Sequence, residues 1–261
     1  SEATRQAGDW PRARALAEAA ITIAEEGNAR ARALLLLGLS SSDALEVCLR
    51  ARAEAPADPS LDARIHLALS DARFGVSFPL AYDDACAALE AAERAKDMSL
   101  VSEALALAAW LQGALTIGDP HATVERALRL ERGSSEHEGN GYASRFILAN
   151  LQMWRDQPDL ARDNFESGLA RAVSTADLFG QAPARLHLAQ VEWRAGAWDR
   201  AATHAWEGLD EWPADEPKAR GSLLWIASLI AVHQGKLSEA RAMAHEALAT
   251  AEYDRLFGAR N

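Results

Sequence analysis

Apolar residues recur along this chain at the spacing of helices, and short polar stretches separate the apolar runs. In "PARLHLAQVEWRA" the apolar positions fall three and four residues apart, which is the pattern of an amphipathic helix. Stretches such as "EEGNAR" and "WPADEPK" interrupt this pattern with Gly, Pro and charged residues. No segment alternates apolar and polar residues over a useful length, so the pattern predicts an all-α fold without a sheet.

One phrase is repeated in shape along the chain. "RAGAWDRAATHAWEG" begins at Arg194, "HQGKLSEARAMAHEA" at His233 and "QAGDWPRARALAEAA" at Gln6. In each phrase a Gly is followed by a bulky apolar residue two positions later and by two Ala residues. Gly196 and Gly235 lie about 39 positions apart, and similar steps back along the chain reach related stretches. A period of this size is typical of solenoids, so we predict about seven repeated units in a single helical-repeat array over residues 1–261.

Each unit is predicted to be a helical hairpin. The first helix ends at a Gly, because Gly adopts the left-handed capping conformation without a steric penalty. A two-residue turn and a second helix follow. In the second helix an Ala pair spaced by four, such as Ala201 and Ala205, lies on one face and lets the two helices approach closely. Such a hairpin cannot bury its apolar face alone, so the units are expected to stack on one another.

The repeated residues resemble those of tetratricopeptide repeats. The sixth unit matches at seven positions: Ala189, Gly196, Trp198, Ala201, Ala205, Gly208 and Leu209. The seventh unit also matches, the first matches in its second half, and the other four match in part. The resemblance implies a right-handed α-solenoid of about seven tetratricopeptide-like hairpins.

The long period, together with "VEWRAGAWDRA" and "HQGKLSEARAMAHEAL", is similar to the helical-repeat region of large ATP-binding LuxR-type transcription activators. The maltotriose-responsive activator is one of these. The resemblance implies a sensor region that receives an inducer or an inhibitory partner, between a nucleotide-binding module and a helix-turn-helix domain. Neither a G-x-x-x-x-G-K-[ST] loop nor a recognition helix is present, so this chain is expected to be a fragment of a larger protein.

The net charge and the cysteines indicate which partners and which cellular compartment to expect. The formal net charge is −11, which argues against direct nucleic-acid contact, because phosphate binding needs a basic face. Cys48 and Cys86 stand in Ala-rich and Leu-rich helical patterns and are expected to be buried thiols of a reducing compartment. No secretory signal and no membrane-spanning apolar run is found, so we expect a cytoplasmic protein without a membrane contact.

Catalysis, metal binding and a cofactor are not expected. The seven histidines form no paired metal motif, and no Ser stands in a G-x-S-x-G elbow. The carboxylate pair Asp83 and Asp84 is expected at the start of a helix, where negative charge meets the helix dipole.

Four tryptophans occur once per unit in the predicted first helices of units four to seven. In tetratricopeptide-like superhelices the first helices line the concave groove, so these rings are candidate ligand contacts. The register of the family adds polar neighbours. The full predicted groove set is Trp110, Gln112, Asn150, Trp154, Gln190, Trp193, Arg194, Trp225 and His233. The alternative is that the rings pack between hairpins; Trp10 and Trp198, at the turn position, are expected to be structural.

Two functions remain open at this stage. The first is a non-catalytic sensor module of a LuxR-type regulator, with a small-molecule inducer, a protein or a peptide in the groove. The second is a free-standing scaffold that binds a protein or peptide partner. The first unit lacks most of its first helix, so the N-terminal end is expected to be truncated or to dock a missing module or a second chain, which would form a homo-oligomer.

Overall fold

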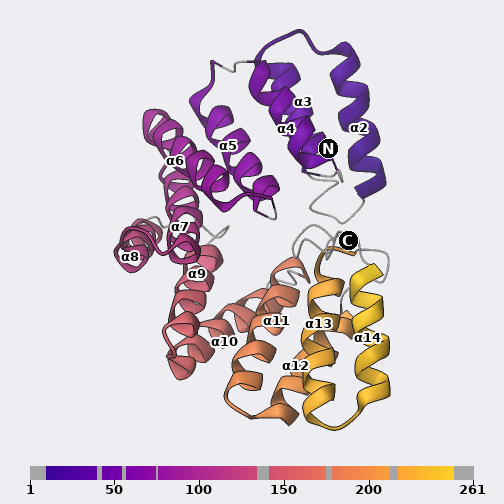
Figure 1. The fold of residues 1–261 in the computed structure, drawn as a ribbon. Coiled ribbons are helices and arrows are strands. Elements are labelled where there is room, and N and C mark those ends of the chain that lie inside the picture. Colours follow the sequence, from indigo (N-terminus) through magenta and orange to yellow (C-terminus); the bar gives the residue numbers. More distant parts are fainter. Residues whose placement is uncertain are drawn as a thin grey trace. The chain divides into compact units, whose positions relative to one another are not determined.

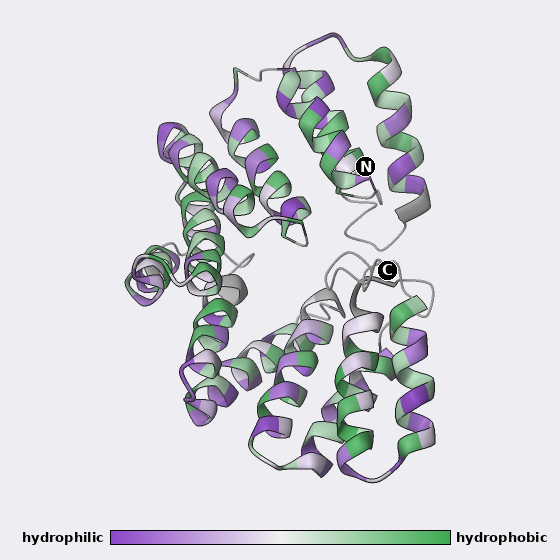
Figure 2. Cartoon of the chain, viewed as in Figure 1, coloured by the Kyte–Doolittle hydropathy of each residue, from purple (hydrophilic) through white to green (hydrophobic). Residues whose placement is uncertain are grey.

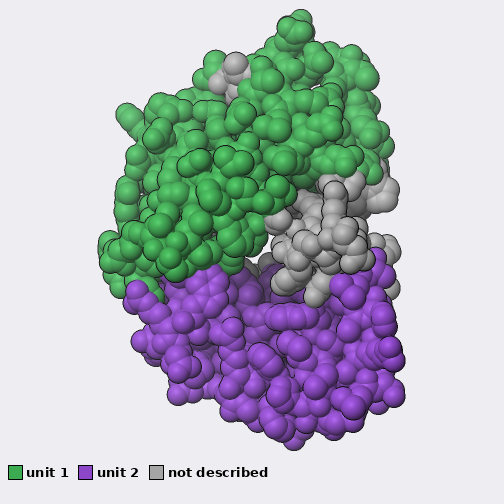
Figure 3. Space-filling model, in the orientation of Figure 1, with its two compact units in different colours: residues 1–137 green, residues 138–261 purple. Residues whose placement is uncertain are grey.

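The computed structural model describes residues 10–39, 43–54, 57–74, 76–133, 141–174, 178–211 and 217–249. Within these ranges the chain forms thirteen helices and no strand (Figure 1). It divides into two compact units, residues 1–137 and residues 138–261, and each is described by itself (Figure 3). That residues 1–261 act as one continuous array stays a prediction.

The helices follow one another with short links. Unit 1 contains α2 (Trp10–Ile23), α3 (Asn28–Gly38), α4 (Ala44–Ala53), α5 (Pro59–Arg73), α6 (Phe78–Ala95), α7 (Met98–Leu115) and α8 (Pro120–Gly133). Unit 2 contains α9 (Gly141–Trp154), α10 (Pro158–Ser174), α11 (Leu178–Arg194), α12 (Trp198–Glu211), α13 (Pro217–His233) and α14 (Leu237–Ala249).

The helices pack as a series of hairpins. We call α3, α5, α7, α9, α11 and α13 the A helices, and the others the B helices. Each A helix packs against the B helix that follows it, and neighbouring A helices touch within each unit: α3 with α5, α5 with α7, α9 with α11, and α11 with α13. This arrangement confirms the predicted all-α, tetratricopeptide-like solenoid. The first predicted repeat contributes only its B helix, α2, to the described residues.

Small residues allow the close packing of the hairpins. On α12 the predicted pair Ala201 and Ala205 is fully buried, and Gly208 continues the same face one turn later. On α6 the residues Ala81, Ala85 and Ala88 play the same part. The opposite faces of these helices are polar, so hydrophilic and hydrophobic residues alternate along them in Figure 2.

Four of the A-to-B links close with the same hydrogen-bond pattern. After α11 the N–H of Gly196 donates to Trp193 O (3.1 Å) and the N–H of Ala197 donates to Glu192 O (2.9 Å). This pair of bonds is a Schellman motif, and it requires a left-handed residue after the helix. The predicted Gly196 and Gly235 supply that residue after α11 and α13, each with φ 76°. Thr116 (φ 55°) and Asp156 (φ 58°) supply it after α7 and α9.

α7 is the one helix of the described residues that is long and apolar enough to cross a membrane, by length and composition alone. Half of its residues are buried within unit 1. It contacts α6 and α8 along the chain and also touches α5. A core helix that is covered by neighbours on several sides needs apolar residues around most of its circumference.

Candidate binding surface

The A helices of unit 2 carry large apolar side chains at equivalent positions. Trp154, Trp193 and Val232 stand in the last turns of α9, α11 and α13, about 39 positions apart. Because α11 touches both α9 and α13, these last turns belong to neighbouring helices. Trp154 is 40% exposed and Val232 is 50% exposed. We call these three residues the apolar row.

Trp193, the middle member of this row, belongs to a cluster of three rings. The ring of His233 lies edge-on to Trp193, with centroids 5.7 Å apart, and stacks on Trp198, with centroids 5.0 Å apart. The structure therefore brings together Trp193 and His233, both of which are predicted groove residues. Trp198 was expected to pack within its own hairpin, whereas its ring also covers a residue of the next hairpin. The side chain of Trp10 lies outside the described residues.

The indole N–H of Trp193 is buried and meets no acceptor among the described residues. A buried donor without a partner costs about 1–3 kcal/mol in stability. An ordered water or an acceptor that arrives with a ligand would satisfy this group, because tryptophan N–H groups normally find a partner when they are buried.

Basic side chains follow the apolar row. Arg155, Arg194 and His233 each come one residue after a member of the row, and all three are exposed. Neither Arg155 nor Arg194 forms an ion pair with another described residue, unlike Arg162, which contacts both Glu192 and Asp159. We call Arg155, Arg194 and His233 the basic row.

The buried carboxylate of Glu192 links the end of α11 to two other helices. Glu192 is 1% exposed and forms ion pairs with Arg162 of α10 and with Arg200 of α12, the latter at 2.9 Å. A buried charge is tolerated only when it is paired and hydrogen-bonded. The three helices are thus tied together next to Trp193, a contact that the sequence analysis did not anticipate.

Gln190, another predicted groove residue, is engaged with a neighbour on the same helix. Its Oε1 lies 3.1 Å from Nδ1 of His187. The imidazole of His187 is packed between two phenyl rings, with centroids 4.6 Å from Phe146 and 5.2 Å from Phe165. Burial among these rings lowers the pKa of His187 to about 4.

Two predicted groove residues of unit 2 have side chains that are buried or half-buried. Asn150 is 1% exposed, and its side-chain amide donates a hydrogen bond to Phe146 O, one turn earlier on α9. Trp225 is half-buried and packs against the core formed by α11 to α14. Arg194 and Trp154 are exposed, as a ligand contact would require.

In unit 1 the two predicted groove residues pack between helices. Trp110 lies 4.1 Å from Phe74 and 5.7 Å from Phe78, measured between ring centroids. The side chain of Gln112 donates to the hydroxyl of Tyr82 on α6 (3.2 Å) and accepts from Thr123 on α8 (2.8 Å). Both polar atoms of the Gln112 side-chain amide are therefore used inside the unit.

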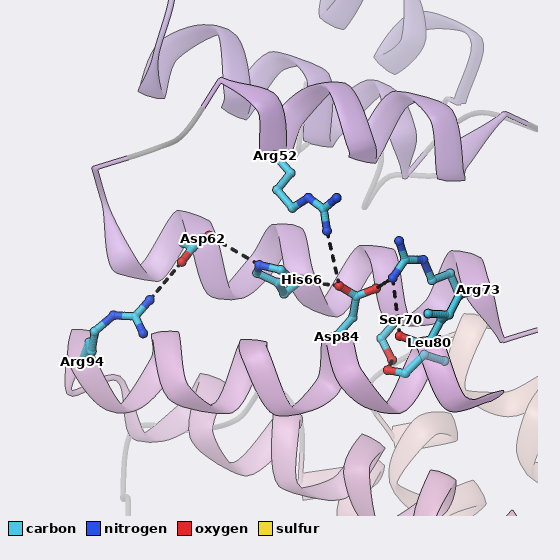
Figure 4. A network of polar contacts seen from close by, with 9 residues as sticks. Arg52, Asp62, His66, Ser70, Arg73, Leu80, Asp84 and Arg94 are labelled. Atoms are coloured by element: carbon cyan, nitrogen blue, oxygen red, sulfur yellow. Dashed lines mark hydrogen bonds and ion pairs between the residues drawn. The ribbon is translucent and has the colours of Figure 1, made fainter. Parts of the chain in front are cut away.

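A polar network in unit 1 was missed by the sequence analysis (Figure 4). Asp84 is 3% exposed and contacts Arg73 and, at 2.9 Å, Nδ1 of His66; both partners lie on α5. Arg52 of α4 approaches the same carboxylate to 3.9 Å. The expectation that Asp83 and Asp84 open a helix is wrong, because α6 already begins at Phe78. Asp84 instead shares the buried face of Ala81 and Ala88, and this position was the available sequence signal.

The described residues contain no group of three or more His, Cys, Asp or Glu side chains that could hold a metal ion. The two cysteines are free thiols. Cys48 is buried, and burial raises its pKa to about 11, which makes it a poor nucleophile. Cys86 is half-buried, and burial raises its pKa as well.

No protein-family model and no curated protein matches the chain. Among solved structures it is similar to the Rap protein complexed with the competence and sporulation factor, with a TM-score of 0.70 and 16% identity over 97% of this chain and 77% of that chain. It is also similar to NprR in complex with its cognate peptide NprX, with a TM-score of 0.67 and 14% identity over 99% of this chain and 81% of that chain. A third similar structure is BtubC (BKLC) from P. vanneervenii, with a TM-score of 0.56 and 15% identity over 97% of this chain and 93% of that chain. At these identities the likeness shows the fold alone.

Proposed function

We propose that this chain is a non-catalytic binding module that holds a peptide against the A-helix ends of unit 2. The observation that carries the proposal is the buried indole N–H of Trp193, which lacks an acceptor among the described residues. Trp154 and Val232, in the last turns of the neighbouring A helices, are exposed and can take up the side chains of a ligand.

A peptide fits this surface because it offers both kinds of contact. Its side chains can cover Trp154 and Val232, and one of its backbone carbonyls can accept the N–H of Trp193 when the side chains that cover this buried atom move aside. Tryptophan and arginine are the residues in which binding energy is most often concentrated at protein interfaces. NprR, which has a similar fold, holds a cognate peptide in its solved structure.

The finer proposal is that the module is the sensor region of a LuxR-type transcription regulator. In that role, bound peptide would favour one of two arrangements of the hairpins and so bias the assembly of the whole protein. The single array over residues 1–261 and a cytoplasmic location belong to the same proposal. Mass spectrometry of the native polypeptide that carries these residues tests it: nucleotide-binding and helix-turn-helix sequences in the same polypeptide support the regulator. A polypeptide without them supports the alternative, a free-standing peptide-binding scaffold.

The binding function itself is tested with fluorescein-labelled peptide libraries and the anisotropy of the label. Trp193→Phe keeps an aromatic ring and removes the N–H, so we expect the dissociation constant of a bound peptide to rise about three- to tenfold. Trp206→Phe is the matched control, because Trp206 is 44% exposed on the B helix α12, away from the A-helix ends. Equal affinities for wild type and Trp193→Phe would contradict the proposed site.

A further inference from the structure

The arginines of the basic row differ from four other arginines of unit 2. Arg162, Arg185, Arg200 and Arg220 all form ion pairs with glutamate or aspartate side chains of the same unit. Arg155 and Arg194 are exposed and have no such partner among the described residues. Arg241 of α14 also has no ion pair among the described residues, but it stands on a B helix, whereas Arg155 and Arg194 stand at equivalent positions beside exposed or half-buried tryptophans of the A helices.

The third member of the row adds a directed donor. The ring of His233 is held between Trp193 and Trp198, and an imidazole carries at least one N–H in either of its neutral tautomers. Of the nearby acidic groups, Glu192 is buried and already pairs with Arg162 and Arg200, while Asp156 and Asp199 are exposed in or next to the turns. None of these three carboxylates forms an ion pair with Arg155 or Arg194, so the two guanidinium groups keep their capacity for a ligand carboxylate.

From this arrangement we infer that the ligand of unit 2 is an acidic peptide, whose carboxylates pair with the basic row while apolar side chains cover the apolar row. This inference rests on the proposed function, because it assigns a ligand class to the same site. Charge complementarity selects the acidic peptide: a basic peptide would place like charges beside Arg155 and Arg194.

The spacing of the helices also predicts a sequence pattern for the peptide ligand. Packed helices lie about 8–10 Å apart, and a peptide in the polyproline II conformation advances about 3.1 Å per residue and places every third side chain on one face. A peptide that crosses the ends of α9, α11 and α13 therefore meets a new basic residue about every third position. The preferred ligand has an Asp or Glu at every third position, with apolar residues between them.

The test uses two labelled peptides of identical composition. In one, Asp occupies every third position; in the other, the same Asp residues are adjacent. Binding to the whole chain is measured by anisotropy at low and at high salt, for wild type, Arg155→Glu and Arg194→Glu. Arg241→Glu is the control, because Arg241 is an exposed arginine of α14 without an ion pair among the described residues.

We expect the spaced peptide to bind more tightly, and each reversal in the basic row to weaken it about tenfold at low salt and less at high salt, because salt screens exposed charges. Arg241→Glu should change binding less than twofold. The inference is overturned if peptides bind and still respond to Trp193→Phe, but with no preference for acidic spacing and no effect of Arg194→Glu; the proposed function survives that result.

Two further outcomes overturn the inference in other ways. If no peptide of either kind binds, the proposed function fails together with the ligand class. If the chain self-associates in sedimentation experiments and Arg194→Glu abolishes the association, the occupant of the basic row is a second copy of the chain.

Discussion

Gly208 of α12 lies against Leu223 of α13, so closely that a β-carbon on Gly208 would stand 2.8 Å from Cδ2 of Leu223. Leu223 is fully buried in the core of unit 2 and has little room to move away. The absence of a side chain at residue 208 therefore sets the distance between the sixth and seventh hairpins. Unit 1 has a similar close approach within one hairpin, where a β-carbon on Gly38 of α3 would stand 2.6 Å from Sγ of Cys48 on α4.

We predict that Gly208→Ala destabilises the protein. Alanine favours helix formation over glycine by about 1 kcal/mol, but overpacking a closed core costs about 1–3 kcal/mol, so the net loss should be up to about 2 kcal/mol. Urea unfolding of the variant measures this difference. A variant as stable as wild type would show that α12 and α13 separate easily.

The neighbouring residues Asp83 and Asp84 allow a matched comparison of an exposed and a buried carboxylate. Asp84→Ala leaves Arg73 and Arg52 without their buried carboxylate, and removing one partner of a buried ion pair costs about 3–5 kcal/mol. Asp83 is exposed, so Asp83→Ala should change stability by less than about 0.5 kcal/mol. Thermal unfolding of both variants checks the difference, and similar melting temperatures would contradict the account of Asp84.

The lowered pKa of His187 predicts a pH effect. Its pKa is about 4 in the folded protein and about 6.5 when unfolded, so between these values the unfolded chain binds more protons. Stability should therefore be complete above about pH 6.5 and fall as the pH drops toward about 4, by up to about 3 kcal/mol. His187→Phe removes this contribution. Parallel stability curves for variant and wild type between the two pH values would show that His187 does not titrate in this way.

The turn residues predict opposite effects at equivalent positions. Thr116 is β-branched and has φ 55°, a conformation that glycine adopts without strain. Thr116→Gly should therefore stabilise unit 1 by about 1 kcal/mol, whereas Gly196→Ala should destabilise unit 2 by about 1 kcal/mol. Guanidinium unfolding measures both, and a loss of stability in Thr116→Gly would contradict the assignment of strain.

The repeat architecture could be predicted from the sequence because it depends on local features. The spacing of Gly196, Ala201 and Ala205 recurs in other units, and each of these residues has the predicted role: a left-handed turn or a buried small contact. The turn after α7 differs, because both Thr116 and Gly118 adopt positive φ there. A β-branched residue is a poor sequence signal for such a turn, and only the packing of the helices imposes it.

The individual contacts of the candidate site could be predicted only in part. The partners of Trp110 and Gln112 come from other helices, so their roles depend on the angle and register of packing rather than on periodicity. Asp84 and Glu192 were missed for the same reason, because their arginine partners lie on different helices. Trp154, Trp193 and Arg194 remain candidate ligand contacts, since they stand at the ends of the A helices, where no following turn of the helix covers them.

The most direct test of the account follows the indole N–H of Trp193 by nuclear magnetic resonance. The chain contains eight tryptophans, and the signal of Trp193 is assigned by its loss in Trp193→Phe. On addition of the peptide with Asp at every third position, we predict a downfield shift of the Trp193 N–H and its protection from exchange, with the signal of Trp206 unchanged. Saturating peptide that leaves the Trp193 signal in place, or shifts only signals of tryptophans in unit 1, would contradict the proposed binding surface.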